Sequence, residues 1–507
     1  MPLWKKFTAV VLTAGLISGL AGCSGSSAGA ENETSLTLGL NIPVTTFSTA
    51  EAGWGDQAPY LQAVYDTILR ADPNGSIVEG LATAWEYNED NTVLTLTIRD
   101  GVEFTDGTAL DADAVAQNLL RFRDSAGSLS AYLATVTDVT TTGPNTVVLT
   151  LSDSNPALLT YLTMAAGLVQ SPAAFENTDL QTNPVGSGPY VLDTAKTVVG
   201  TSYVFEKKAE YWNPESVHYD AITINVYGDT TALLNAIKGG QVNAANFNNN
   251  NVAHEIEASG FTLNSFEPSW AGLLLLDRAG SLTPALGDVR VRQAINHAFD
   301  KDAMIQAVGV GYGTATTQVI PETSVGFDST LDDRYPYDLG KAKELMAEAG
   351  YADGFTINLP TTAVLGTTVY SLIQEQLGQI GITVNYTDAG DGASYVGELI
   401  NAKVSAGFLN LQQDQDWALI GLQIAADGTF NPFHTRDPQV DALTSRIHDA
   451  TGDEYATALR ELNAHVVEQA WFAPWYRSVY FIATDETTSV TTQVGNSFPY
   501  LWNFIPA

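Results

Sequence analysis

Cysteine and basic residues are both scarce in this chain. Its 507 residues include a single Cys, so no intrachain disulfide can form. Lys and Arg together number 22 against 57 Asp and Glu, which gives a formal net charge of −35. Nucleic-acid binding needs a basic surface, and so few cations cannot supply one. The sequence therefore excludes a disulfide-rich scaffold and predicts that nucleic acid is not a partner.

Long apolar runs are also nearly absent. A polytopic membrane protein needs repeated apolar spans of about 18 residues or more, and only residues 1–22 come near that length. Apolar residues still make up 45% of the chain, which is enough for a large core and too many for intrinsic disorder. At roughly 150 residues per domain, we expect two to three domains.

Local motifs for catalysis and for metal binding are missing as well. The chain has no Gly-x-x-x-x-Gly-Lys-Ser/Thr segment, so a P-loop for a nucleotide is excluded. Gly-Ser-Gly-Pro at 186–189 lacks the spacing of a nucleophile elbow. His-Glu at 254–255 begins like a zinc-protease helix, but no His stands at position 258. We therefore expect no enzymatic activity, no cofactor and no bound metal, and we interpret the acidic residues as a solvated surface.

The first thirty residues indicate export and a lipid anchor. Two lysines precede an apolar stretch that ends in Leu-Ala-Gly-Cys at 20–23. This segment resembles the signal of secreted lipoproteins, in which cleavage falls before the Cys and the Cys sulfur takes a diacylglyceryl group. We expect residues 1–22 to be the signal peptide, Cys23 to be lipidated and 23–34 to be a flexible Ser/Gly/Ala-rich tether. An uncleaved transmembrane anchor is the alternative, and the shortness of the apolar stretch disfavours it.

Strand and helix patterns alternate along the rest of the chain. Residues 92–99 and 145–151 alternate apolar with other side chains, as half-buried strands do. Helical stripes of apolar residues follow Asp111 or Asp113, and Asp288, which can cap the helix starts. Helix followed by strand recurs, and no short internal repeat is present. We therefore expect an α/β or α+β fold with mixed sheets.

Six segments of distinctive sequence are spread over the chain. They are Arg-Asp-Gly-Val-Glu-Phe-Thr-Asp-Gly-Thr at 99–108, Pro-Val-Gly-Ser-Gly-Pro-Tyr at 184–190, Tyr-Trp-Asn at 211–213, Ala-Ile-Lys-Gly-Gly-Gln-Val at 236–242, Asp-Val-Arg-Val-Arg-Gln-Ala-Ile at 288–295, and the stretch 338–354. Together they resemble the extracytoplasmic solute-binding proteins of family 5, which are the peptide- and nickel-type binding components of ABC importers. The resemblance runs from about Ser35 to Ala507.

The resemblance implies a periplasmic-binding-protein-like class II fold, in which two α/β lobes and an extra domain enclose a ligand cleft between the lobes. Two chain crossings, near Trp270 and near Val479, would form the hinge. The expected segments are 35–75, 183–270 and 478–507 for lobe I, 76–182 for the extra domain, and 271–477 for lobe II.

The resemblance also implies a function. We expect the protein to bind a small solute, with an oligopeptide or dipeptide as the leading ligand class, and to deliver it by hinge closure to an ABC permease. A separate ATPase must supply the energy, because the chain has no nucleotide motif. We expect an extracytoplasmic monomer, anchored to the cell membrane by its N-terminal lipid. An oligosaccharide or a nickel chelate is the alternative ligand, and a surface hydrolase or a sensory receptor is the alternative class of protein.

One segment of the resemblance bears on the ligand. Peptide-binding relatives often hold the ligand's amino group with an Asp in a Trp-x-x-Asp-Tyr/Phe segment, and residues 411–417 here read Leu-Gln-Gln-Asp-Gln-Asp-Trp. Asp414 stands at the acidic position, so the resemblance implies an ammonium contact there; an ordinary surface acid is the alternative. The further candidates are Trp270, Trp417 and Phe47 as apolar walls, Gln412 and Gln413 as partners of a peptide backbone or of sugar hydroxyls, and His434 for a nickel complex. For each of these aromatic residues, core packing is the interpretation that the sequence favours, and a wall of the ligand cleft is the alternative.

Overall fold

The computed structural model describes residues 34–507 except 178, 181, 248–249 and 414. The predicted signal peptide, the predicted lipidation site Cys23 and most of the predicted tether therefore lie outside the described residues, as does Asp414. Within the described part, no helix combines the length and the apolar character needed to cross a bilayer.

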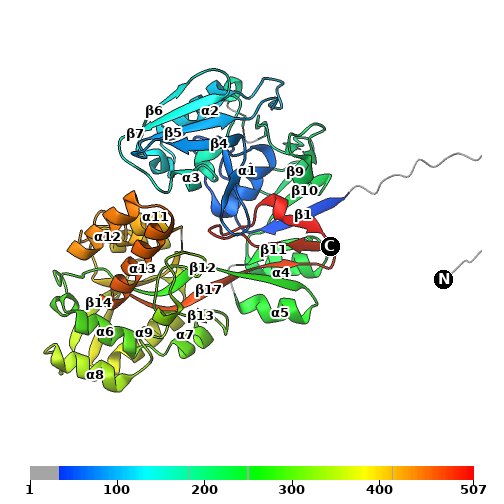
Figure 1. Cartoon of the computed structure of the whole chain (residues 1–507). Helices are drawn as coiled ribbons and strands as arrows, with labels where there is room; N and C mark the ends of the chain where they lie inside the picture. The colour runs from blue at the N-terminus through cyan, green and yellow to red at the C-terminus, as the bar shows by residue number, and fades with distance from the viewer. Residues whose placement is uncertain (1–33, 178, 181, 248–249, 414) are drawn as a thin grey trace, which may run out of the picture. The chain divides into compact units, whose positions relative to one another are not determined.

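A mixed nine-stranded sheet runs through the described body (Figure 1). The first strand, β1 (Ser35–Leu40), lies parallel to both of its neighbours, and the two longest strands, β12 and β17, are antiparallel partners. Along the sheet the order is β16 (Ala406–Gln412), β12 (Thr262–Leu275), β17 (Phe472–Thr484), β11 (Ala244–Phe247), β1, β10 (Ala221–Val226), β9 (Ser202–Lys207) and β8 (Tyr190–Leu192), with β13 (Thr314–Ala315) paired to β17.

The burial of these strands follows from their place in the sheet. In β1, Leu36, Leu38 and Leu40 are buried, as alternation of side chains across a strand requires. The second half of β12, from Ser269 to Leu275, is buried at every position. A strand covered on both faces loses the apolar-polar alternation that marks a half-exposed strand.

A separate four-stranded antiparallel sheet has the order β4 (Ala82–Tyr87), β5 (Val93–Ile98), β7 (Thr146–Leu151) and β6 (Val136–Thr141). Helix α2 (Ala112–Arg123) packs against β6 and β7. Its N-cap is Asp111, whose carboxylate accepts a hydrogen bond from the Ala114 N–H at 2.9 Å. Both the strands predicted at 92–99 and 145–151 and the helix predicted after Asp111 are confirmed.

Residues 289–468 form mostly helices around a small parallel sheet of β14 (Phe355–Thr361) and β15 (Ile382–Asp388). The helices are α6 (Val289–Ala298), α7 (Lys301–Ala307), α8 (Leu339–Glu348), α9 (Thr368–Gly378), α10 (Gly392–Ile400), α11 (Asp416–Leu419), α12 (Pro438–Asp449) and α13 (Gly452–Glu468). Asp288 caps α6 through the Arg290 N–H, as predicted. These sheets and helices confirm the predicted mixed α/β class.

The remaining elements are short. They are α1 (Ala58–Val64), β2 (Leu69–Ala71), β3 (Ile77–Glu79), α3 (Leu158–Tyr161), α4 (Thr230–Lys238), α5 (Ala253–Ala258), β18 (Thr488–Val490) and β19 (Phe504–Pro506). Strands β12 and β17 contain the positions of the two predicted hinge crossings, Trp270 and Val479. The boundaries of the two lobes and of the extra domain stay predictions.

Two of the distinctive sequence segments meet at one buried carboxylate. The Asp66 side chain accepts hydrogen bonds from Tyr211 Oη at 2.7 Å, Ser187 Oγ at 2.8 Å and Trp212 Nε1 at 3.0 Å, and it pairs with Arg70 at 3.0 Å. A buried carboxylate needs this many donors to offset its lost hydration. These residues of the 184–190 and 211–213 segments therefore hold the fold together.

Candidate functional site

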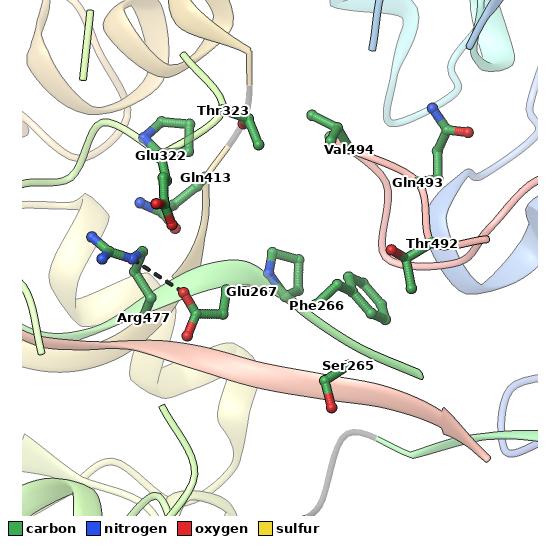
Figure 2. Close-up of a pocket in the computed structure, with 13 residues that line it drawn as sticks. Ser265, Phe266, Glu267, Glu322, Thr323, Gln413, Arg477, Thr492, Gln493 and Val494 are labelled. Carbon is green, nitrogen blue, oxygen red and sulfur yellow. Dashed lines mark hydrogen bonds and ion pairs between the residues drawn. The ribbon is translucent and has the colours of Figure 1, made fainter. Parts of the chain in front are cut away.

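A cavity of about 310 Å³ opens beside β12, and we call it the cleft cavity (Figure 2). Its lining consists of 265–268 from β12, Arg477 from β17, the loop 321–323, Gln413 at the end of β16 and the loop 492–495. In Figure 2 the loop carrying Val494 lies on the opposite side of the cavity from Gln413. The cavity therefore joins segments that stand far apart in the sequence.

An irregularity in β12 shapes the floor of the cleft cavity. Phe266 pairs with Tyr480 and Ser269 pairs with Ser478, so β12 has one residue more than β17 in this interval. An extra residue of this kind is a β-bulge, which bends the strand and redirects its side chains. The bulge contains Glu267 and a proline, a residue that cannot donate to the strand ladder. This is why Glu267 lines the cavity.

A charged cluster fixes that floor in place. The Arg477 guanidinium donates to Glu267 Oε2 at 3.1 Å and to Asp332 Oδ2 at 3.2 Å, and its side chain is only 4% exposed. The Thr314 hydroxyl donates a hydrogen bond to Glu267 at 2.6 Å, and the Thr316 hydroxyl donates one to Asp332 at 2.6 Å. Because two carboxylates already pair with the Arg477 guanidinium, this cation is not available to pair with an anionic solute.

The charged form of a lysine beside this cluster is destabilised by burial. Burial lowers the pKa of Lys301 to about 8, although Asp332 and Asp333 act in the opposite direction. An ammonium group that loses water without a close carboxylate partner gives up its proton more readily. The Lys301 amino group is therefore only partly protonated at mildly alkaline pH.

The cleft cavity continues into a second cavity of about 150 Å³, which we call the acidic pocket. The two share Gln413 and parts of the loops 321–323 and 492–495. The acidic pocket adds the turn 74–75, Gln415 and Asp416 to the lining. It is the part of the site in which an unpaired charge lies.

Two side chains of the acidic pocket are incompletely paired: Asp416 lacks a cation and Gln413 Oε1 lacks a hydrogen-bond donor among the described residues. Burial raises the pKa of Asp416, whose carboxylate accepts bonds from the hydroxyls of Ser324 and Tyr455 and pairs with no cation among the described residues. Gln413 is 4% exposed and donates from Nε2 to the Val319 carbonyl at 3.0 Å, while its Oε1 has no partner in the described part of the chain. Both acceptors are suited to N–H groups of a solute.

Comparison with known proteins identifies the family. Residues 76–440 match the family described as bacterial extracellular solute-binding proteins, family 5. The chain belongs to this family. The resemblance noted in the sequence is thereby confirmed, and the protein is an extracytoplasmic solute-binding protein.

Relatives of this family 5 protein support the assignment. The glutathione-binding protein GsiB of Escherichia coli K12 is 28% identical over 471 residues, which cover 89% of both chains. HbpA2 from Haemophilus parasuis has a similar structure, with a TM-score of 0.82, 21% identity and coverage of 93% of this chain and 100% of the other. DppA from Helicobacter pylori, in complex with the peptide STSA, has a TM-score of 0.76 at 20% identity, with 94% and 98% coverage. These structures confirm the two-lobed periplasmic-binding-protein fold.

The candidates from the 411–417 segment lie in different places. Gln413 lines the cleft cavity and the acidic pocket, whereas Gln412 is exposed and lines neither. Trp417 is partly buried and lines a third cavity, together with Gln415. Asp414 lies outside the described residues, and its contact with a ligand ammonium stays a prediction.

The other candidates lie apart from these cavities. Trp270 and Phe47 are completely buried, and neither lines the cleft cavity or the acidic pocket. The indole N–H of Trp270 is taken by Gln423 Oε1 at 3.1 Å. His434 has a side chain that is 71% exposed, and its Nδ1 lies 3.1 Å from the Ala426 carbonyl. The ligand roles of these residues stay predictions.

Several lining residues had no signal in the sequence. Glu267 lines the site because of a bulge, and the loop 492–495 carries no motif. Asp416 stands two positions after Asp414, so the same segment contained the clue. Its burial without a cationic partner, however, depends on Tyr455 and Ser324, which are distant in the chain.

Proposed function

We propose that this protein binds a peptide in the acidic pocket and the cleft cavity, and delivers it to an ABC permease driven by a separate ATPase. The observation that carries the proposal is the Asp416 carboxylate, which has no cationic partner among the described residues, together with Gln413 Oε1, which has no hydrogen-bond donor there. A peptide offers an N-terminal ammonium group and a row of backbone N–H groups. The ammonium would pair with Asp416, and a backbone N–H would donate to Gln413.

The charge of the lining supports a cationic or donor-rich ligand end. The acidic residues Glu267, Glu322 and Asp416 line the two cavities, against Arg477 as the one basic residue in their described lining. Arg477 already has two carboxylate partners. This lining therefore attracts an ammonium group more strongly than an anionic group. Peptide binding also agrees with the bound peptide of DppA and with the glutathione named for GsiB.

Hinge closure would couple binding to transport. The loops 321–323 and 492–495 approach the same cavities from different parts of the fold. A ligand that contacts both loops binds the closed arrangement more tightly than an open one, so it shifts the population toward the closed state. The closed state is then the form that the permease recognises.

We further propose that the mature protein is a monomer held at the cell membrane by lipid on Cys23. The support is the sequence pattern at 1–23, in which a positive start, an apolar stretch and Leu-Ala-Gly-Cys agree in order and length. Residues 23–34 would act as the tether. A lipidated protein remains near the permease it serves.

Titration calorimetry with defined ligand classes tests the proposal. Tripeptides, trisaccharides and a nickel–histidine complex are titrated into residues 34–507, which form one compact unit. Saturable binding of tripeptides alone supports the proposal, whereas selective binding of the sugars or of the nickel complex contradicts it. Hydrolysis of the bound peptide during the titration would instead indicate an enzyme. Asp414→Asn is measured in parallel, and unchanged peptide affinity would show that Asp414 does not hold the ammonium group.

A further inference from the structure

A third cavity of about 400 Å³ lies next to the acidic pocket, and we call it the aromatic pocket. It is lined by three aromatic rings, those of Tyr132, Tyr161 and Trp417, and by Gln415, Gly421 and smaller or aliphatic neighbours. No residue of its described lining carries a charge. Its chemistry therefore differs from that of the other two cavities, which are lined by acids.

The rings of the aromatic pocket are held in fixed positions. Tyr132 and Tyr161 stack with their centroids 4.1 Å apart and their planes within 7°. The third ring, Trp417 on α11, lies 5.3 Å from the ring of His448. His448 is itself held by Asp449 at 2.8 Å and by the Ser154 carbonyl at 2.9 Å. Preformed ring surfaces of this kind bind another ring with little loss of conformational freedom.

The aromatic pocket adjoins the site described above through one shared lining residue. The side chain of Gln415 lines both the acidic pocket and the aromatic pocket. It accepts a hydrogen bond from the Thr160 hydroxyl, which joins α3 to the start of α11. A solute held at Asp416 therefore lies one side chain away from the rings.

We propose that the aromatic pocket is the subsite for an aromatic or large apolar side chain of the bound peptide. This inference rests on the proposed peptide-binding function and adds a ligand preference to it. Its volume falls in the range of small-molecule sites, and a phenyl or indole group fits within it. An ammonium group at Asp416 and a ring in the aromatic pocket together define an amphiphilic peptide ligand.

Gly421 offers a way to fill the aromatic pocket without damage to the fold. A Cβ added at Gly421 would meet no atom within 4 Å, and Gly421 does not have positive φ. Gly421→Leu therefore adds an aliphatic side chain at the lining of the aromatic pocket. Gly378, an exposed glycine at the end of α9, has the same open surroundings. Gly378→Leu is the matched control.

The test compares Ala-Ala-Ala with its three single-Phe variants by titration calorimetry. In the wild type, at least one Phe peptide should bind about 10- to 100-fold more tightly than Ala-Ala-Ala, as burial of one phenyl group predicts. Gly421→Leu should remove this preference, while Gly378→Leu should keep it and leave the affinity for Ala-Ala-Ala unchanged. Equal affinity of the wild type for all four peptides, or a preference that survives in Gly421→Leu, would overturn the inference.

A second measurement separates failure of the inference from failure of the proposed function. If none of the four peptides binds, the peptide function is refuted. Saturation-transfer NMR with phenylalaninamide and alaninamide then measures whether the aromatic pocket binds an aromatic group independently of peptide binding. Binding of phenylalaninamide that Gly421→Leu abolishes would support the aromatic subsite. No difference between the two amides in the wild type would overturn it. Thermal unfolding of each variant shows that the fold is retained.

Discussion

Replacing Asp416 by Asn tests the proposed ammonium contact most sharply, because the change keeps the size of the side chain and removes its charge. A hydrogen bond to a charged group contributes about 1.5–3 kcal/mol, so peptide affinity should fall about 10- to 150-fold. The free protein should be no less stable, because burial without a cationic partner already disfavours the Asp416 carboxylate. Titration calorimetry at pH 7 measures the affinity, and thermal unfolding measures the stability.

The pH dependence of Asp416 gives the same prediction a second readout. Burial raises its pKa above the ordinary value of 3.8, so the folded protein holds this proton more firmly than the unfolded chain does. The free protein therefore loses stability as pH rises through the interval between 3.8 and the raised pKa, and Asp416→Asn should lack that loss. Peptide affinity should fall as pH drops through the same interval, since a neutral carboxyl group attracts ammonium weakly.

An exposed acid supplies the control for Asp416→Asn. The side chain of Asp427 is 87% exposed, and Asp427→Asn removes the same charge from the protein. If long-range charge alone governs affinity, the two variants should weaken peptide binding equally. An equal loss in both variants, or unchanged affinity in Asp416→Asn, would refute the proposed contact.

Three further predictions follow from the structure. Burial lowers the pKa of Lys301 from 10.5 to about 8, so the unfolded state binds more protons than the folded state between these values. The free energy of unfolding should therefore rise with pH between about 8 and 10, by at most about 3 kcal/mol. Denaturant titrations should show no such rise in Lys301→Met, whereas the exposed control Lys343→Met should retain it. Arg477→Met leaves Glu267 and Asp332 without their cation and should destabilise the fold by about 3–5 kcal/mol. The exposed control Arg436→Met should change the stability by close to zero. Chemical denaturation measures both changes. In the native host, Cys23→Ala should release the protein from the membrane fraction, and unchanged membrane association would argue against lipidation at Cys23.

The secondary structure was predictable where the signal is local. The strand β5 follows the alternation of 92–99, and α2 and α6 begin at acids that cap their first turns. Alternation and capping depend on residues within a few positions of one another, so the sequence alone carries them. The family resemblance added the two-lobed arrangement, which depends on contacts between distant segments.

The candidate site was predictable only in part. The resemblance drew attention to 411–417. In that segment Gln413 lines both the cleft cavity and the acidic pocket, and Gln415 lines both the acidic pocket and the aromatic pocket. Trp270 shows the limit of this reasoning, because it lies in a strand covered on both faces, where the sequence pattern is the same for a core ring and a cleft wall. The bulge at Glu267 and the loop 492–495 depend on strand register and loop packing, which no local pattern encodes.

The central claim is that the cavities bind a peptide, and native mass spectrometry of protein purified without refolding tests it most directly. Tight ligands of such proteins stay bound during purification, so the spectrum reports the mass of what the cell supplied. We expect added masses that fragment into amino-acid residues, with an aromatic or large apolar residue among them. Hexose spacings or the mass of a nickel complex would contradict it.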